Sequence, residues 1–159
     1  MIHDREGRSF TDWEFLKNLS LAISRNQINV VDYIIDQKSD AEDGVDFSTL
    51  HSGLRAAIET DQIDILKHLV GRYIKKEKRD DCNFPEGIKN RFRDCISEAS
   101  SLGRLEMVKF LMEFIMWPIA DINMFLAPAT SNAIQKDQLQ VFHYFRARWN
   151  VYRDRKSVV

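Results

Sequence analysis

Apolar residues along the chain recur in four segments that align with one another without gaps. In each segment an alanine is followed four positions later by a residue typical of turns, and apolar residues then return with a polar residue between them. The four segments are residues 19–35, 54–70, 96–112 and 130–146. Apolar positions separated by three and four residues form one face of a helix. Each segment therefore predicts a helix, a turn and a second helix.

Two shared positions define the repeat. The invariant alanines are Ala22, Ala57, Ala99 and Ala133, at intervals of 35, 42 and 34 residues. A small residue at this position predicts that two helices approach closely. The turn residues are Asn26, Asp61, Gly103 and Asp137. These residue types tolerate the left-handed backbone conformation and commonly cap helices. Helical pairs at this interval stack into a solenoid, because no single pair can bury its own apolar stripe.

The second and third segments resemble the core of the ankyrin repeat. Residues 57–70 read AIETDQIDILKHLV and residues 99–111 read ASSLGRLEMVKFL, similar to the family pattern A-A-x-x-G-H-L-E-V-V-K-L-L-L. The resemblance covers about residues 17–146 in four degenerate copies. The family's T-P-L-H signature and its G-A-D-x-N turn are both missing. We therefore expect irregular loops in place of regular β-hairpin fingers.

The predicted fold is all-α, a solenoid of about four degenerate ankyrin-like helix-turn-helix repeats in a single domain over residues 1–159. The expected repeats span about residues 17–36, 52–78, 94–117 and 128–156, with the first and last as caps. Residues 36–48 are acidic and predict an exposed connector. Between the second and third repeats we expect a helix extended through Lys78, a loop, and a helix starting near Pro85. Pro118 predicts a helix end, with a further turn over residues 121–126.

Composition and charge narrow the class of protein. The 159 residues are 44% hydrophobic with a net charge of −1, enough for a core and unlike a protein built as a whole to hold nucleic acid. Cys82 and Cys95 are too few for a disulfide scaffold and lack zinc-site spacing, which favours a reducing compartment. The first ten residues are charged where a signal peptide is apolar. We expect a cytoplasmic protein with no membrane contact.

The sequence holds no recognisable catalytic or cofactor-binding motif. The four histidines have no metal-ligand spacing, and the six glycines form no phosphate loop. We read His68 and His143, which share a repeat position, as structural or solvated. The prediction is a binding protein that is not an enzyme, with no cofactor, no metal and no small-molecule substrate. An enzyme or accessory subunit with an unrecognised site stays open as an alternative.

The ankyrin resemblance implies a partner-binding surface. In that family the exposed residues just before the inter-helix turn face a partner protein on the concave side of the solenoid. The corresponding residues are Ser24, Arg25, Glu59, Thr60, Ser101, Leu102, Gln135 and Lys136. Leu102 is apolar at a position predicted to be exposed, so it is either a binding anchor or buried by residues 71–93. Short divergent proteins of this kind resemble those of large DNA viruses, phages and intracellular bacteria, which implies sequestration or inhibition of a host factor.

The C-terminal segment supports a second hypothesis. Basic side chains alternate there with the aromatic residues Trp149 and Tyr152; they are Arg146, Arg148, Arg153, Arg155 and Lys156. Such a mixture can bind single-stranded nucleic acid by stacking and phosphate contact. The competing interpretation is a terminal cap, because Phe145, Trp149 and Tyr152 form one helical stripe that would pack on the preceding repeat.

Overall fold

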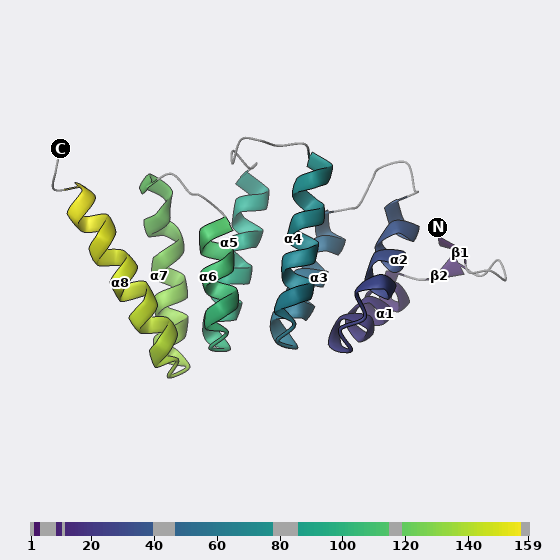
Figure 1. Cartoon of the computed structure of the whole chain (residues 1–159), viewed down its shortest axis with the longest axis horizontal. Coiled ribbons are helices and arrows are strands. Elements are labelled where there is room, and N and C mark those ends of the chain that lie inside the picture. Colours follow the sequence, from purple (N-terminus) through teal and green to yellow (C-terminus); the bar gives the residue numbers. More distant parts are fainter. Residues whose placement is uncertain are drawn as a thin grey trace. The chain divides into compact units, whose positions relative to one another are not determined.

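The computed structural model describes residues 2–3, 9–10, 12–39, 47–77, 86–114 and 119–156 (Figure 1). These residues form eight helices and two short strands. The chain divides into two units, Met1–Lys78 and Arg79–Val159, and each is considered by itself. The predicted all-helical class is confirmed for the described part of the chain. Within that part, no helix is both long and apolar enough to cross a membrane.

The first unit contains two helical pairs. Its helices are α1 (Asp12–Ser24), α2 (Ile28–Ser39), α3 (Phe47–Glu59) and α4 (Ile63–Glu77). Helix α1 packs against both α2 and α3, and α3 packs against α4. The strands β1 (Ile2–His3) and β2 (Ser9–Phe10) pair antiparallel, with β2 beside α1. The sequence pattern did not predict these two-residue strands.

The second unit also contains two helical pairs. Its helices are α5 (Glu86–Ser101), α6 (Leu105–Phe114), α7 (Ile119–Gln135) and α8 (Leu139–Lys156). Helix α5 packs against α6 and α7, while α8 packs against α7 and α6. In both units, therefore, the first helix of one pair lies beside the first helix of the next pair.

All four pairs turn through the same backbone geometry. The turn residues are left-handed, with φ of 54° at Asn26, 60° at Asp61, 70° at Gly103 and 55° at Asp137. In the first pair, the Asn26 N–H donates to the Ile23 carbonyl at 2.9 Å, and the next N–H donates to the Ala22 carbonyl at 3.0 Å. This bond pair is a Schellman cap, and it recurs in the other three turns. The predicted left-handed turns are thus confirmed at all four positions.

The repeated alanines lie at the centre of the packing. All four are buried, as predicted from their size. Each second helix also buries apolar residues, including Leu69, Leu111 and Phe145. A larger residue in the alanine column would have to push two helices apart, because protein interiors are close-packed.

The first helices begin earlier than the predicted repeat boundaries. The reason is a buried position seven residues before each alanine, occupied by Phe15, Leu50, Phe92 and Leu126. Burying these side chains extends α1 and α3 by five residues and α7 by nine residues beyond the predicted repeat starts, whereas the start of α5 was predicted near Pro85. Residues 121–126, predicted as a separate turn, are part of α7, which continues through Pro128.

The ends of the longer connection agree with prediction. Helix α4 ends at Glu77 and α5 begins at Glu86, each within one residue of the predicted Lys78 and Pro85. Residues 40–46, 78–85 and 115–118 lie outside the described residues. The expected irregular loops, and the helix end at Pro118, therefore stay predictions.

Candidate functional site

The residues predicted to contact a partner lie at the C-terminal ends of the first helices. We call them the turn-edge residues: Ser24, Arg25, Glu59 and Thr60 in the first unit, and Ser101, Leu102, Gln135 and Lys136 in the second. All are exposed except Ser101, which is half-buried. Within each unit the two first helices pack side by side, with their turns at the same end (Figure 1). Each unit thus brings four turn-edge residues onto one edge.

Several turn-edge side chains are held by their own helix. The Ser24 hydroxyl donates to the Leu21 carbonyl at 2.8 Å, and the Thr60 hydroxyl donates to the Ala56 carbonyl at 2.7 Å. The Ser101 hydroxyl makes the same kind of bond, at 2.8 Å. Each of these carbonyls also accepts a backbone N–H, so the hydroxyls add a second bond at the helix end and fix their own side-chain orientation. The sequence contained this signal, since Ser and Thr commonly bond back along a helix, but the spacing argument did not use it.

Leu102 stands apart as an apolar residue on this edge. Its side chain is 43% exposed, so the alternative that residues 71–93 bury it is wrong. It directly precedes Gly103, whose left-handed conformation fixes the direction in which the chain leaves the helix. Exposed apolar side chains on a fixed backbone serve as anchors in many interfaces.

An ionic cluster joins α2 and α4 in the first unit. The Nε2 atom of His68 lies 2.7 Å from Oδ1 of Asp32, and the Arg72 guanidinium donates to Asp32 and Asp36. Burial favours the neutral form of Asp32, but hydrogen bonds and charges from His68 and Arg72 outweigh it and lower the pKa of Asp32. The half-buried contact with Asp32 agrees with the structural interpretation of His68. Sequence reasoning missed the cluster itself.

The second unit has an ion pair at equivalent repeat positions. Arg148 of α8 lies 3.7 Å from Glu113 of α6 and also sits over the Tyr144 ring, 5.5 Å from its centroid. Counted from the repeated alanines, Glu113 matches Asp36 and Arg148 matches Arg72. The same two positions thus link neighbouring pairs in both units. These contacts are structural, and they involve Arg148, one of the basic side chains of the C-terminal segment.

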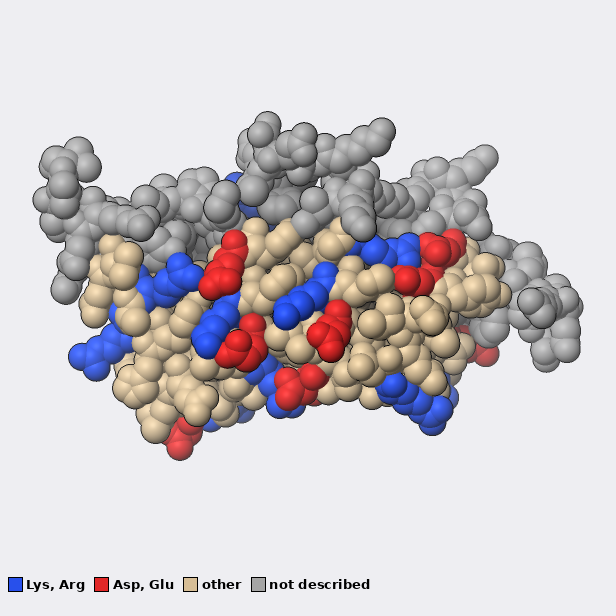
Figure 2. All heavy atoms as spheres, in the orientation of Figure 1, with Lys and Arg blue, Asp and Glu red and all other residues tan. Residues whose placement is uncertain are grey.

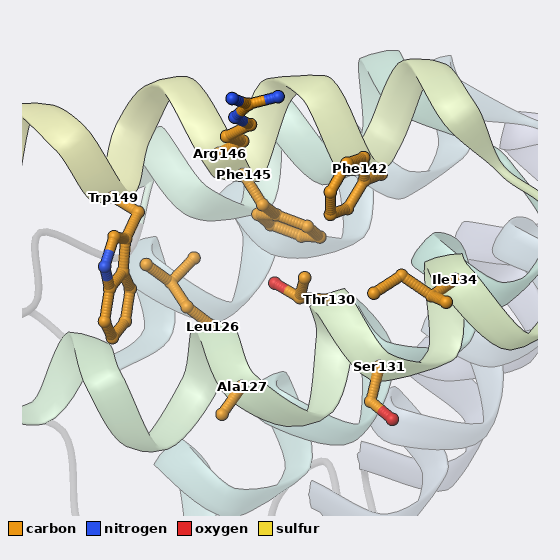
Figure 3. Close-up of a pocket in the computed structure, with 9 residues that line it drawn as sticks. All are labelled: Leu126, Ala127, Thr130, Ser131, Ile134, Phe142, Phe145, Arg146 and Trp149. Atoms are coloured by element: carbon orange, nitrogen blue, oxygen red, sulfur yellow. The ribbon is translucent and has the colours of Figure 1, made fainter.

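A cavity of about 410 Å³ opens between α7 and α8. Helix α7 contributes Leu126, Thr130 and Ile134, and α8 contributes Phe142, Phe145 and Trp149 (Figure 3). The Arg146 side chain points away from the cavity in this view. The walls are apolar and carry no convergent set of acids and bases, so the cavity has the chemistry of a contact surface.

The predicted C-terminal cap is only partly correct. Phe145 is buried, as the cap requires, whereas Trp149 is 45% exposed and lines the cavity. The side chains of Tyr152, Arg153, Arg155 and Lys156 lie outside the described part of the structure. The nucleic-acid hypothesis for this segment therefore stays a prediction.

Other chemistry is sparse in the residues that the structure describes. Among them, no three His, Cys, Asp or Glu side chains come together as metal ligands. Cys95 is buried in α5, and Cys82 lies outside the described residues. On the visible face of each unit, acidic and basic side chains are interspersed (Figure 2). Comparison with known proteins finds no matching family model, no matching curated protein and no matching solved structure.

Proposed function

We propose that the chain is a protein-binding module that recognises a partner protein through its turn-edge residues. We further propose that its four helical pairs form a short, degenerate ankyrin-like solenoid with these residues on its concave face. The observation that carries the proposal is a contrast. The four turns share one backbone geometry, while the exposed side chains beside them differ in charge, size and polarity.

A rigid frame with varied exposed chemistry is suited to recognition. The Schellman caps and buried alanines hold each turn edge in place, so binding needs little ordering of the backbone. Glu59, Arg25 and Lys136 supply charges of both signs. Leu102 supplies an apolar anchor, and such anchors commonly contribute most of the binding energy in an interface. Sequestration or inhibition of the partner follows as the simplest role for a binding module of this kind.

The test compares two triple variants with the wild type in affinity capture followed by mass spectrometry. The turn-edge variant carries Glu59→Arg, Leu102→Glu and Gln135→Glu. The matched control makes the same kinds of charge change at exposed positions outside the turn-edge residues: Asp94→Arg in α5, and Asn29→Glu and Gln140→Glu in the first turns of α2 and α8. Circular dichroism and thermal unfolding check that both variants stay folded.

The outcomes separate the functional classes. A protein retained by the wild type and the control but lost from the turn-edge variant supports the proposal, and its affinity is then measured with the purified components. Equal retention by all three proteins overturns the turn-edge assignment. Recovery of nucleic acid alone, with binding that weakens steeply as salt rises, would favour the C-terminal alternative instead.

A further inference from the structure

The last helical pair exposes positions that earlier pairs bury. The residue directly after the repeated alanine is fully buried at Ile23 in α1 and at Ser100 in α5, whereas Ile134 in α7 is 60% exposed. Within each unit, the first helix of the next pair packs on the helix that carries this position: α3 on α1, and α7 on α5. A Cβ atom added at Gly53 of α3 would lie 3.7 Å from the Ile23 side chain, which places the two helices in contact.

Ile134 belongs to a mainly apolar surface, which we call the last-pair face: the buried Leu126 together with Thr130, Ile134, Phe142 and Trp149. Together these residues line the cavity between α7 and α8 (Figure 3). Thr130 and Phe142 occupy the repeat positions of Leu19 and Val31, which the first pair buries. The last-pair face therefore occupies the same repeat positions that are buried in the first pair, where a further helical pair follows.

The first helical pair exposes the complementary positions. We call Asn18, Leu21 and Val30 the first-pair face; Leu21 is 47% and Val30 42% exposed. Their equivalents in α7 and α8 are Ala129, Asn132 and Val141. Ala129 and Val141 are buried, and the Asn132 side-chain amide donates to the Ser97 carbonyl of α5 at 3.5 Å. The first-pair face thus has the positions that receive a preceding helical pair.

We propose that two copies of the chain associate head to tail, with the first-pair face of one copy on the last-pair face of the next. The occupant is a second copy because the contact continues, position for position, the packing of α3 on α1 and of α7 on α5. Terminal repeats that stay monomeric normally present a polar outer face, whereas the last-pair face is mainly apolar and the first-pair face exposes Leu21 and Val30 beside Asn18. Head-to-tail contacts do not close by two-fold symmetry, so they build longer assemblies or rings.

The charged positions are compatible with this contact. Within each unit, an acid on one pair meets an arginine on the next, as Asp36 meets Arg72 and Glu113 meets Arg148. At the corresponding positions of the proposed contact stand Ala147 and Gln37. No like charges meet there, and burial of the apolar surfaces supplies the driving force. Arg146 lies at the edge of the last-pair face, where its aliphatic chain can pack against the contact while its guanidinium stays in water.

The test measures the mass of the full-length chain against concentration by analytical ultracentrifugation. The wild type is expected to exceed the monomer mass of 18.6 kDa progressively as concentration rises. Ile134→Glu on the last-pair face and Val30→Glu on the first-pair face each bury an unpaired charge in the contact. Each should weaken self-association at least about tenfold. Gln135→Glu and Asn29→Glu add the same charge at neighbouring exposed positions and should leave it unchanged.

Mixing the two variants gives the decisive result. The Ile134→Glu copy keeps its first-pair face and the Val30→Glu copy keeps its last-pair face, so the mixture should form a dimer that grows no further. A wild type that stays monomeric up to about 1 mM overturns the proposal. So does a dimer that Ile134→Glu abolishes and Val30→Glu leaves intact, because that pattern belongs to a two-fold contact. These readouts need no partner protein, so they are independent of the proposed function.

Discussion

The side chain of Gln138, in the turn between α7 and α8, lies against the backbone of Gly103 in the turn between α5 and α6. A Cβ atom at Gly103 would come within 2.1 Å of the Gln138 Oε1 atom, and Gly103 itself has a φ of 70°. Gly103 thus meets two demands, a left-handed backbone and room for a neighbouring turn. The equivalent turn residues Asn26, Asp61 and Asp137 are also left-handed, but each carries a side chain.

We predict that Gly103→Ala lowers the free energy of unfolding by about 1–2 kcal/mol, because an alanine in the left-handed region is strained. Chemical denaturation measures this loss. Adding Gln138→Ala should recover only the part that comes from the steric clash. Full recovery in the double variant would contradict the backbone explanation.

The same argument predicts that Asp137→Gly raises the free energy of unfolding. Asp137 has a φ of 55°, and glycine adopts that conformation without a Cβ penalty. We expect the free energy of unfolding to rise by about 0.5 kcal/mol, since relief of strain exceeds the added freedom of the unfolded chain. Asp137→Ala, which keeps the Cβ atom and removes the carboxylate, is the control and should not stabilise the fold. Denaturant midpoints of the wild type and the two variants test whether only Asp137→Gly stabilises the fold.

Asp32 predicts a pH dependence of stability. Because His68 and Arg72 lower the pKa of Asp32 in the folded chain, its ionised form stabilises the fold at any pH above its unfolded pKa of about 3.9. That contribution is lost as the pH falls through the lower folded pKa. The difference in unfolding free energy between wild type and Asp32→Asn should therefore shrink as the pH falls below about 4.

Arg72→Met provides the control for this pH dependence. It removes one of the two groups that lower the pKa of Asp32. In that background, the effect of Asp32→Asn at neutral pH should be smaller, and its change with pH weaker. An Asp32→Asn effect that keeps its full size down to pH values of about 2 would show that the carboxylate charge does not contribute.

The sequence predicted best what depends on local backbone chemistry. The left-handed turns and the buried alanines follow from residue type and spacing, because a turn needs a tolerant residue and a close helix contact needs a small one. The early starts of α1 and α3 were missed, although the buried residues Phe15 and Leu50 each lie four residues before an apolar position that was recognised. Extending the helical period backward would have found them.

Contacts between pairs could not be predicted in the same way. Asp32 and Arg72 are separated by 40 residues, and a repeat pattern does not say which exposed charges meet after folding. The exposed apolar faces were missed for a related reason. Ile23 and Ile134 occupy one column of one pattern, but only the arrangement of helices shows that one is covered and the other is exposed.

The alanine column gives a direct test of close packing. We predict that Ala99→Leu lowers the free energy of unfolding by about 1–3 kcal/mol, because a larger side chain must push α5 away from its neighbours. Ala147→Leu is the matched control, since Ala147 is exposed on α8 and should change stability by less than about 0.5 kcal/mol. Thermal unfolding compares the two variants. Equal effects would mean that the buried alanines do not set the helix spacing.

Arg148 and Glu113 should contribute unequally, although they form one ion pair. Glu113 is largely exposed and makes this contact at 3.7 Å, so Glu113→Ala should cost less than about 0.5 kcal/mol. Arg148 also covers the Tyr144 ring, and Arg148→Ala should cost about 1 kcal/mol. Chemical denaturation in low salt and in about 1 M salt separates the two contributions, because salt screens the ion pair far more than the packing. The loss from Arg148→Ala should persist in high salt, and its disappearance there would assign the contribution of Arg148 to charge alone.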